Sequence, residues 1–218
     1  MGAKTWMLVY ADSDPLVTLR SAPDLDVEGT TRLAHTLFPR DTLEEIGRGD
    51  LSYTCPPDDE LHIGQFPGVA VIAAKEFGID YPSRLDPHFL KSSRSQLVYL
   101  HAMHSVVDWF AFAHWRQGTL VRSLSLSPDS GILEDIGPRL PFEAPYWSGV
   151  HPAVAPSDED EEDPYPFPFH PLDLGEAALA AFFGYQIEGL IDESLLEADT
   201  IPLLCFKRKR ARWWRWSK

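Results

Sequence analysis

The densest run of β-branched and aromatic residues in this chain lies at residues 96–126. Residues of these types favour strands because their side chains pack well on a pleated surface. The polar segment 116–119 interrupts the run, and its Gly118 can adopt the left-handed backbone that a short hairpin loop needs. Beyond it, two sets of residues alternate: Leu120, Arg122, Leu124 and Leu126 form one set, and Val121, Ser123 and Ser125 form the other. The pattern predicts a β-hairpin in the middle of a sheet.

Hydrophobic periodicity and turn residues predict the other elements. The predicted strands cover residues 5–11, 42–46, 60–66, 69–74, 185–190 and 200–206, and residues 105–115 of the central run are also expected to be extended. The first strand is continuously apolar, which is typical of a strand buried on both faces. The predicted helices cover residues 24–38 with Asp26 as N-cap, 86–93 with Pro87 at the first position, 174–183 up to Gly184, and a short segment near Glu193. Turns are expected at 12–15, 47–49 and 67–68.

This irregular alternation of helices and strands, with hairpins among them, predicts an α+β fold. We expect one domain over residues 1–206, with a mainly antiparallel or mixed central sheet flanked by helices. A proline-rich insert covers about 127–171, and its acidic run 157–163 is expected to be disordered. The rings of the aromatic–proline segment 165–169 are expected to lie against the body. Residues 207–218 form a basic, Trp-rich tail.

The formal charge of −14 is unevenly distributed. Seven of the 19 Lys and Arg residues follow Phe206, so residues 1–206 contain 12 basic residues and all 33 acidic residues. The body should therefore repel nucleic acid and anionic lipid, whereas the tail should attract both. Two cysteines provide no disulfide framework, and the sequence contains no leader-like or membrane-spanning apolar run. We expect a cytoplasmic protein with reduced thiols.

Four segments carry a resemblance to a known family: MGAKTWMLVYAD at the start, VYLHAMHSVVDWFAF in the middle, and RSLSLSPDSGILEDIG with PFEAPYW after it. On these segments the chain resembles a family of uncharacterised actinobacterial proteins, catalogued only as a domain of unknown function. The resemblance covers residues 1 to about 206 and leaves the acidic run and the basic tail as the variable parts. It implies no activity.

Three residues of the central run could bind a metal ion together: His101, His104 and Asp108. In a helix these positions would share one face, as a metal site requires. In a strand, His101 and His104 point to opposite faces and cannot share a metal unless a turn intervenes. The aromatic content favours the strand, with the histidines as hydrogen-bonding groups of the core. The rival hypothesis is a metal-dependent hydrolase that uses these three residues and Asp12.

Asp12 and Asp14 follow the first predicted strand and precede Pro15. Paired carboxylates at such a position can hold Mg²⁺ or act as acid and base. They are equally typical of a turn in which Asp side chains accept hydrogen bonds from local backbone N–H groups, and we favour the turn. The sequence contains neither a G-x-S-x-G motif nor a glycine-rich phosphate loop. We therefore expect no cofactor and lean against an enzyme.

The proline-stiffened segment 142–147 is the candidate recognition loop. It contributes Glu143, Tyr146 and Trp147, which could bind a ligand or partner together with His104 and Asp108. The alternative is that Tyr146 and Trp147 cover one end of the core. A single cavity shared by these side chains would favour the binding site.

The tail interleaves cationic residues with tryptophan. Its candidate contact residues are Lys207, Arg208, Lys209, Arg210, Arg212, Trp213, Trp214, Arg215 and Trp216. Such a composition suits an anionic membrane surface or single-stranded nucleic acid. The alternatives are a tail that folds back on the acidic body and a disordered tail. The sequence as a whole predicts a cytoplasmic, non-enzymatic protein that binds another protein or a small ligand, with membrane or nucleic-acid contact through the tail only.

Overall fold

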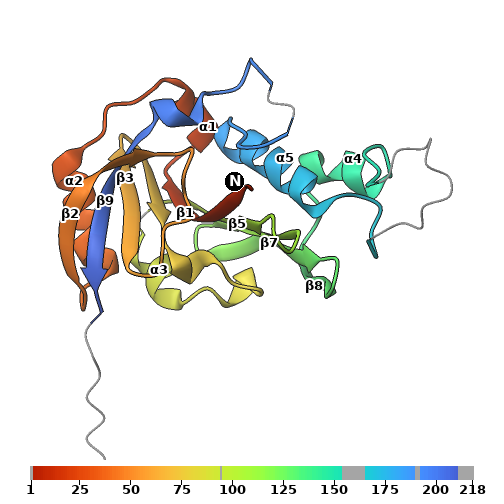
Figure 1. The fold of residues 1–218 in the computed structure, drawn as a ribbon, viewed down its shortest axis with the longest axis horizontal. Coiled ribbons are helices and arrows are strands. Elements are labelled where there is room, and N and C mark those ends of the chain that lie inside the picture. The colour runs from red at the N-terminus through yellow and green to blue at the C-terminus, as the bar shows by residue number, and fades with distance from the viewer. Residues whose placement is uncertain (1, 94, 154–164, 190–191, 211–218) are drawn as a thin grey trace, which may run out of the picture.

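The computed structural model describes residues 2–93, 95–153, 165–189 and 192–210 (Figure 1). Its centre is a nine-stranded sheet in the order β2-β9-β3-β4-β1-β5-β6-β7-β8, and the ladders between neighbouring strands are antiparallel. The strands are β1 (Lys4–Ala11), β2 (Thr42–Asp50), β3 (Glu60–Phe66), β4 (Val69–Ala73), β5 (Leu97–His104), β6 (Trp109–Arg116), β7 (Thr119–Ser127), β8 (Gly131–Ile136) and β9 (Pro202–Lys209). The predicted α+β class is confirmed.

Helices cover both faces of this sheet. The α-helices are α1 (Pro15–Arg20), α2 (Val27–Leu37), α3 (Pro87–Ser92), α4 (Ala144–Trp147) and α5 (Pro171–Phe183), and the 3-10 helices are η1 (Lys75–Phe77), η2 (Pro82–Arg84), η3 (Pro141–Glu143) and η4 (Ala198–Thr200). Helices α1 and α5 pack on one face and α2 and α3 on the other, as Figure 1 shows for α5 above and α3 below the sheet. The fold is thus a sheet with apolar contacts on both sides.

Strand β1 shows how the sequence produces this two-sided burial. Alternate residues of a strand point to opposite faces. Met7 and Val9 therefore join the apolar cluster under α5, whereas Trp6 and Leu8 join the cluster under α2 and α3. The continuous apolar run that predicted a doubly buried strand is explained by this position at the centre of the sheet.

Side-chain caps fix the helix starts. The Asp26 carboxylate accepts a hydrogen bond from Gly29 N at 2.8 Å, and the Asp86 carboxylate accepts one from His88 N at 2.8 Å. The predicted helices at 24–38, 86–93 and 174–183 are present, although α5 begins earlier, at Pro171. Gly184 ends α5 with a φ of 80°, in the left-handed region.

The chain bends at Asp12 and Ser13, where the turn was predicted, and continues directly into a short helix that was not predicted. Asp14 is the N-cap of α1, and its carboxylate accepts a hydrogen bond from Leu16 N at 3.0 Å. Pro15 takes the first helical position, where its missing N–H costs nothing. The six-residue helix is too short for hydrophobic periodicity to reveal it.

The central run differs from the prediction in three ways. It forms three successive strands, β5, β6 and β7, which lie on one side of β1 rather than in the middle of the sheet. Residues 105–108 form a hairpin tip instead of a strand, with Asp108 at a φ of 44°. The register also shifts between His114 and Trp115, so Leu120 packs with the cluster opposite to that of Leu124. Such a bulge reverses the alternation on which the prediction relied.

The edge strand β2 and its neighbour β9 are both longer than predicted. Gly47 and Gly49 lie within β2, and a bulge between Glu45 and Gly47 takes the place of the predicted turn. Strand β9 runs to Lys209, so the boundary at residue 206 between body and tail falls inside a strand. Residues 185–189 form no strand, and the segment at Glu193 is a turn rather than a helix.

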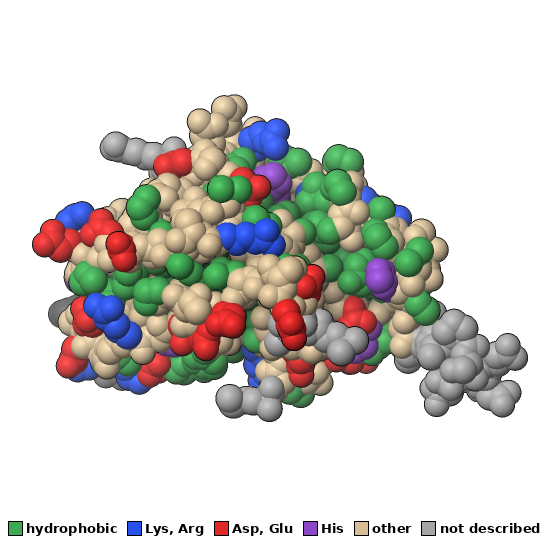
Figure 2. Space-filling view, turned by 90° about the horizontal axis from the view of Figure 1, so that it is seen from above, with side chains coloured by type: hydrophobic (Ala, Val, Ile, Leu, Met, Phe, Trp, Pro, Cys, Tyr) green, Lys and Arg blue, Asp and Glu red, His purple; other side chains and the backbone are tan. Residues whose placement is uncertain are grey.

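The predicted proline-rich insert contains ordered elements, namely strand β8 and helices η3 and α4. Phe167 and Phe169 are buried in the cluster under α5, so the aromatic–proline segment does lie against the body. The acidic run 157–163 falls outside the described residues. Figure 2 views the molecule from above the view of Figure 1 and shows acidic side chains at the left end and in the lower half, with basic side chains among them.

Candidate functional site

The histidines of the hypothetical metal site point to opposite faces of β5. His101 is fully buried on the α5 side, where its Nδ1 lies 2.7 Å from Thr5 Oγ1 and its Nε2 lies 3.0 Å from the Gly175 carbonyl. A carbonyl oxygen only accepts, so Nε2 carries the proton and Nδ1 accepts from the Thr5 hydroxyl. Burial lowers the pKa of His101 to about 4, which keeps the ring neutral. His101 therefore fastens β1 and α5 to β5.

The other proposed metal ligands lie apart from it. Asp108, at the hairpin tip, accepts a hydrogen bond from the Tyr165 hydroxyl at 3.2 Å and lies 3.8 Å from His170 Nε2. Asp12 lines a separate small cavity at the other end of β1. Within the described parts of the chain, no three His, Cys, Asp or Glu side chains are grouped so that they could hold a metal ion. The proposed cluster of His101, His104, Asp108 and Asp12 does not form there.

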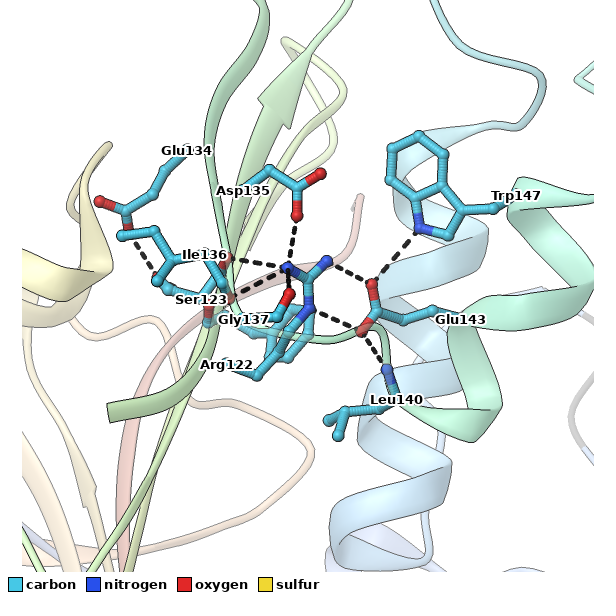
Figure 3. Close-up of polar contacts among 10 residues, drawn as sticks. Arg122, Ser123, Glu134, Asp135, Ile136, Gly137, Leu140, Glu143 and Trp147 are labelled. Atoms are coloured by element: carbon cyan, nitrogen blue, oxygen red, sulfur yellow. Dashed lines mark hydrogen bonds and ion pairs between the residues drawn. The ribbon is translucent and has the colours of Figure 1, made fainter. Parts of the chain in front are cut away.

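Glu143 belongs to a buried ion pair rather than to an open pocket (Figure 3). Arg122 of β7 donates from Nε and Nη2 to the two carboxylate oxygens, at 2.9 and 2.6 Å. Leu140 N and Trp147 Nε1 also donate to this carboxylate, at 2.8 and 3.3 Å. Both side chains of the ion pair are fully buried, and Arg122 Nη1 donates further to the Asp135 carboxylate. The network joins β7 and β8 to the segment at η3 and α4.

Tyr146 and Trp147 are half-buried against the apolar cluster under α5. The Tyr146 hydroxyl donates to the Asp173 carbonyl at 3.1 Å, and the guanidinium of Arg139 lies 3.9 Å from the centre of the Trp147 ring. Trp147 lines a cavity that does not include His104. Of the five predicted binding residues, Trp147 therefore lines one cavity, and His104 lines the separate cleft described below.

The basic residues assigned to the tail divide into two groups. Lys207, Arg208 and Lys209 lie in β9, where Lys207 pairs with Asp59 at 2.8 Å and the buried Arg208 with Glu76 at 2.6 Å. Arg210 follows the strand and pairs with Asp58 at 2.9 Å. The remaining proposed contacts, Arg212, Trp213, Trp214, Arg215 and Trp216, lie outside the described residues.

A cleft of about 620 Å³ lies beside the first residue of β1. It contains three basic side chains from three separate segments: Lys4 of β1, Lys75 of η1 and His104 of β5. Lys4 and His104 are direct partners in the β1–β5 ladder, and Lys75 follows the strand on the other side of β1. We call this hollow the cationic cleft. Its other lining residues are Gly2, Ala3, Trp6, Ser52, Tyr53, Cys55, Pro56, Pro57, Asp58, Val106, Ile187 and Glu188.

The indole of Trp6 forms part of its wall. The ammonium of Lys75 lies 4.4 Å from the centre of the Trp6 ring, a cation–π contact, and the His104 ring lies 5.7 Å away. A side chain at Gly78 would collide with the indole, because its Cβ would come within 2.5 Å of Trp6 Cε3. Trp6 is thus held in place beside the Lys75 ammonium.

His104 presents a hydrogen-bond donor. Its Nδ1 accepts a hydrogen bond from Val106 N at 3.2 Å, so the neutral ring carries its proton on Nε2. Burial, followed by the charges of Lys4 and Lys75, lowers the pKa of His104. The neutral ring at pH 7 can still donate from Nε2 to an anion.

The carboxylates that line the cleft have ionic or hydrogen-bonding partners, whereas its two lysines have no ionic partner among the described residues. Asp58 pairs with Arg210, and the Glu188 carboxylate accepts a hydrogen bond from Ala3 N at 2.8 Å. Neither Lys4 nor Lys75 forms an ion pair with any residue that the structure describes. Two ammonium groups without an ion pair among the described residues therefore line one hollow, together with the carboxylates of Asp58 and Glu188.

Sequence reasoning did not single out Lys4, Trp6 or Lys75. About 100 residues separate Lys4 from His104, and only the strand pairing brings them together. The available signal was the alternation of β1, which places Lys4 and Trp6 on one face, but the partner strand was unknown. Cys55, noted only as a free thiol, also lines the cleft, and burial raises the pKa of this thiol.

No helix in the described parts of the chain has the length and apolar character needed to cross a membrane. No curated protein and no solved structure matches the chain. One family model matches residues 5–206, which is nearly the whole chain. The expectation of a family without assigned function is confirmed, and the chain belongs to a family of unknown function (DUF6928).

Proposed function

We propose that this is a non-enzymatic, cytoplasmic ligand-binding protein whose cationic cleft takes a small organic anion. The observation that carries the proposal is that Lys4, Lys75 and His104 line one cleft, and that neither lysine forms an ion pair with a described residue. Cavities of about 300–1,000 Å³ with apolar walls and a few polar groups are typical small-molecule sites.

The remaining walls favour an anion that carries an apolar group. Ala3, Pro56, Val106 and Ile187 supply apolar surface around the cationic residues. A carboxylate or phosphate would accept hydrogen bonds from the ammonium groups and from His104, and its organic part would contact this surface. A bare inorganic anion would leave this apolar surface in contact with water.

The experiment is a calorimetric titration with phenyl phosphate, benzoate and inorganic phosphate. Wild-type protein is expected to bind phenyl phosphate more tightly than inorganic phosphate. Loss of both charges in Lys4→Gln/Lys75→Gln is expected to weaken phenyl phosphate binding at least about 100-fold, since each charged hydrogen bond is worth about 1.5–3 kcal/mol and two are removed.

Lys91→Gln is the matched control, because Lys91 is exposed on α3 and lines none of these cavities. It should bind as the wild type does. Equal affinity of the wild type and the double lysine variant, with unchanged circular dichroism, would remove the cationic cleft as the binding site.

A further inference from the structure

A second cavity, of about 350 Å³, adjoins the cationic cleft. Both cavities are lined by Trp6 and His104, whose rings lie 5.7 Å apart. The two cavities therefore share this pair of rings in their lining, and we call the two together the groove. We call the second cavity the acidic hollow, because it contains Asp80 and Asp129. Its remaining lining residues are Gly78, Val107, Trp109, Ser127, Ser130 and Leu133.

The tip of the β5–β6 hairpin borders both parts of the groove. Val106 lines the cationic cleft and Val107 lines the acidic hollow. Their exposed fractions are 74% and 52%, which makes them two adjacent exposed hydrophobic residues. A ligand that extends along the groove would contact both valines and cover apolar surface that is otherwise in water.

A buried donor in the acidic hollow lacks an acceptor. Trp109 is 7% exposed and lines the hollow, and its Nε1 has no hydrogen-bond partner among the described residues. A buried indole N–H normally has a partner, because leaving it unsatisfied costs free energy. Trp109 Nε1 is itself inaccessible, so it is an unsatisfied donor within the wall of the hollow.

The two ends of the groove carry opposite charges. Asp80 and Asp129 are exposed, and neither forms an ion pair with any residue in the described ranges. At the other end, Lys4 and Lys75 are likewise unpaired within these ranges. A ligand with a single negative charge would satisfy the cationic cleft alone. A ligand with an anion at one end and a cation at the other would complement both ends.

We infer that the groove binds an extended zwitterion, namely a short peptide with free termini. Its carboxylate lies between Lys4 and Lys75, and its ammonium lies beside Asp80 and Asp129. The backbone between them crosses the Trp6–His104 pair, and small apolar side chains contact the two valines of the hairpin tip. This inference rests on the proposed function, because it assigns the anionic end of the ligand to the same cleft.

The test compares the tripeptide Ala-Val-Ala with its N-acetylated and C-amidated forms in calorimetric titrations. Wild-type protein should bind the free tripeptide at least tenfold more tightly than either blocked form. In Asp80→Asn/Asp129→Asn, acetylation should make no further difference, whereas amidation should still weaken binding. In Lys4→Gln/Lys75→Gln, amidation should make no further difference, whereas acetylation should still weaken binding. Asp24→Asn, an exposed acidic position outside both cavities, is the control and should behave as the wild type does.

Two results would overturn the inference and leave the proposed function intact. The first is wild-type binding of phenyl phosphate without any binding of the tripeptide. The second is equal wild-type affinity for the free and the acetylated tripeptide, which would show that the acidic hollow contributes nothing. Absence of binding for phenyl phosphate and tripeptide alike would remove both proposals. The variants replace exposed side chains except at the partly buried Lys4, and circular dichroism verifies that each one is folded.

Discussion

Replacement of Glu143 by Ala tests the buried ion pair at the end of the sheet. In the folded protein its carboxylate accepts four hydrogen bonds, two of them from Arg122. The substitution leaves the fully buried guanidinium with the partly exposed Asp135 as its remaining carboxylate partner. Removing one member of a buried ion pair costs about 3–5 kcal/mol, because the other charge stays desolvated. We expect Glu143→Ala to lower the free energy of unfolding by about 4 kcal/mol.

The assay is urea denaturation followed by tryptophan fluorescence and far-UV circular dichroism. For a domain of this size, the expected loss corresponds to a fall in Tm of about 8–16 °C, at about 2–4 °C per kcal/mol. The double variant Arg122→Met/Glu143→Leu removes both charges. It should be clearly more stable than the summed costs of Arg122→Met alone and Glu143→Leu alone predict. Asp135→Asn should cost less than Glu143→Ala, because the Asp135 side chain is 35% exposed.

Two results would refute this reasoning. One is a cost of Glu143→Ala below about 1 kcal/mol, which is typical of an exposed ion pair. The other is strict additivity in the double-mutant cycle. Either result would return Glu143 to the set of candidate binding residues, because its carboxylate would then have no structural role.

The remaining predictions concern a buried carboxyl group and a buried arginine. Burial raises the pKa of Glu176 from its ordinary value of 4.5 to about 7. The unfolded chain therefore loses this proton at a lower pH than the folded protein does. As a result, the free energy of unfolding falls as the pH rises from about 4.5 to about 7. Glu176→Gln should therefore be more stable than the wild type at pH 8, by up to about 3 kcal/mol, and nearly equal at pH 5; urea denaturation that shows the same difference at both pH values would contradict this. Arg208→Met should cost about 3 kcal/mol because it leaves Glu76 and Asp41 without their buried partner, whereas Arg210→Met, at a half-exposed side chain, should cost less than about 1 kcal/mol. If thermal denaturation showed equal losses of stability for Arg208→Met and Arg210→Met, the ion pairs of Arg208 would contribute no more than those of an exposed residue.

The strands could be predicted from sequence wherever burial is two-sided. The apolar runs of β1 and β4 specify doubly buried strands, and the turn residues Pro67 and Gly68 mark the hairpin between β3 and β4. Prediction failed where the same residue types are compatible with more than one local structure. Gly47 suggested a turn but occupies a bulge in β2, and Val106 and Val107 suggested a strand but lie at an exposed hairpin tip.

The functional side chains were harder to predict because their neighbours are distant in sequence. The alternating pattern showed Arg122 among leucines, but not that Glu143 would neutralise it, 21 residues away. The basic residues Lys207 and Arg208 read as a tail because acidic partners such as Asp59 and Glu76 come close only when β9 pairs with β2 and β3. Charge in a sequence locates cations, whereas strand pairing decides which of them remain unpaired.

The pKa of His104, measured by an NMR titration of its ring protons, tests the cationic cleft most directly. Burial and the charges of Lys4 and Lys75 place this pKa below its ordinary value of 6.5 in the free protein. We predict that saturating phenyl phosphate raises the pKa, because a bound anion offsets the two ammonium charges, and that Lys4→Gln/Lys75→Gln raises it without ligand. A His104 pKa that neither the anion nor the double substitution changes would contradict the account.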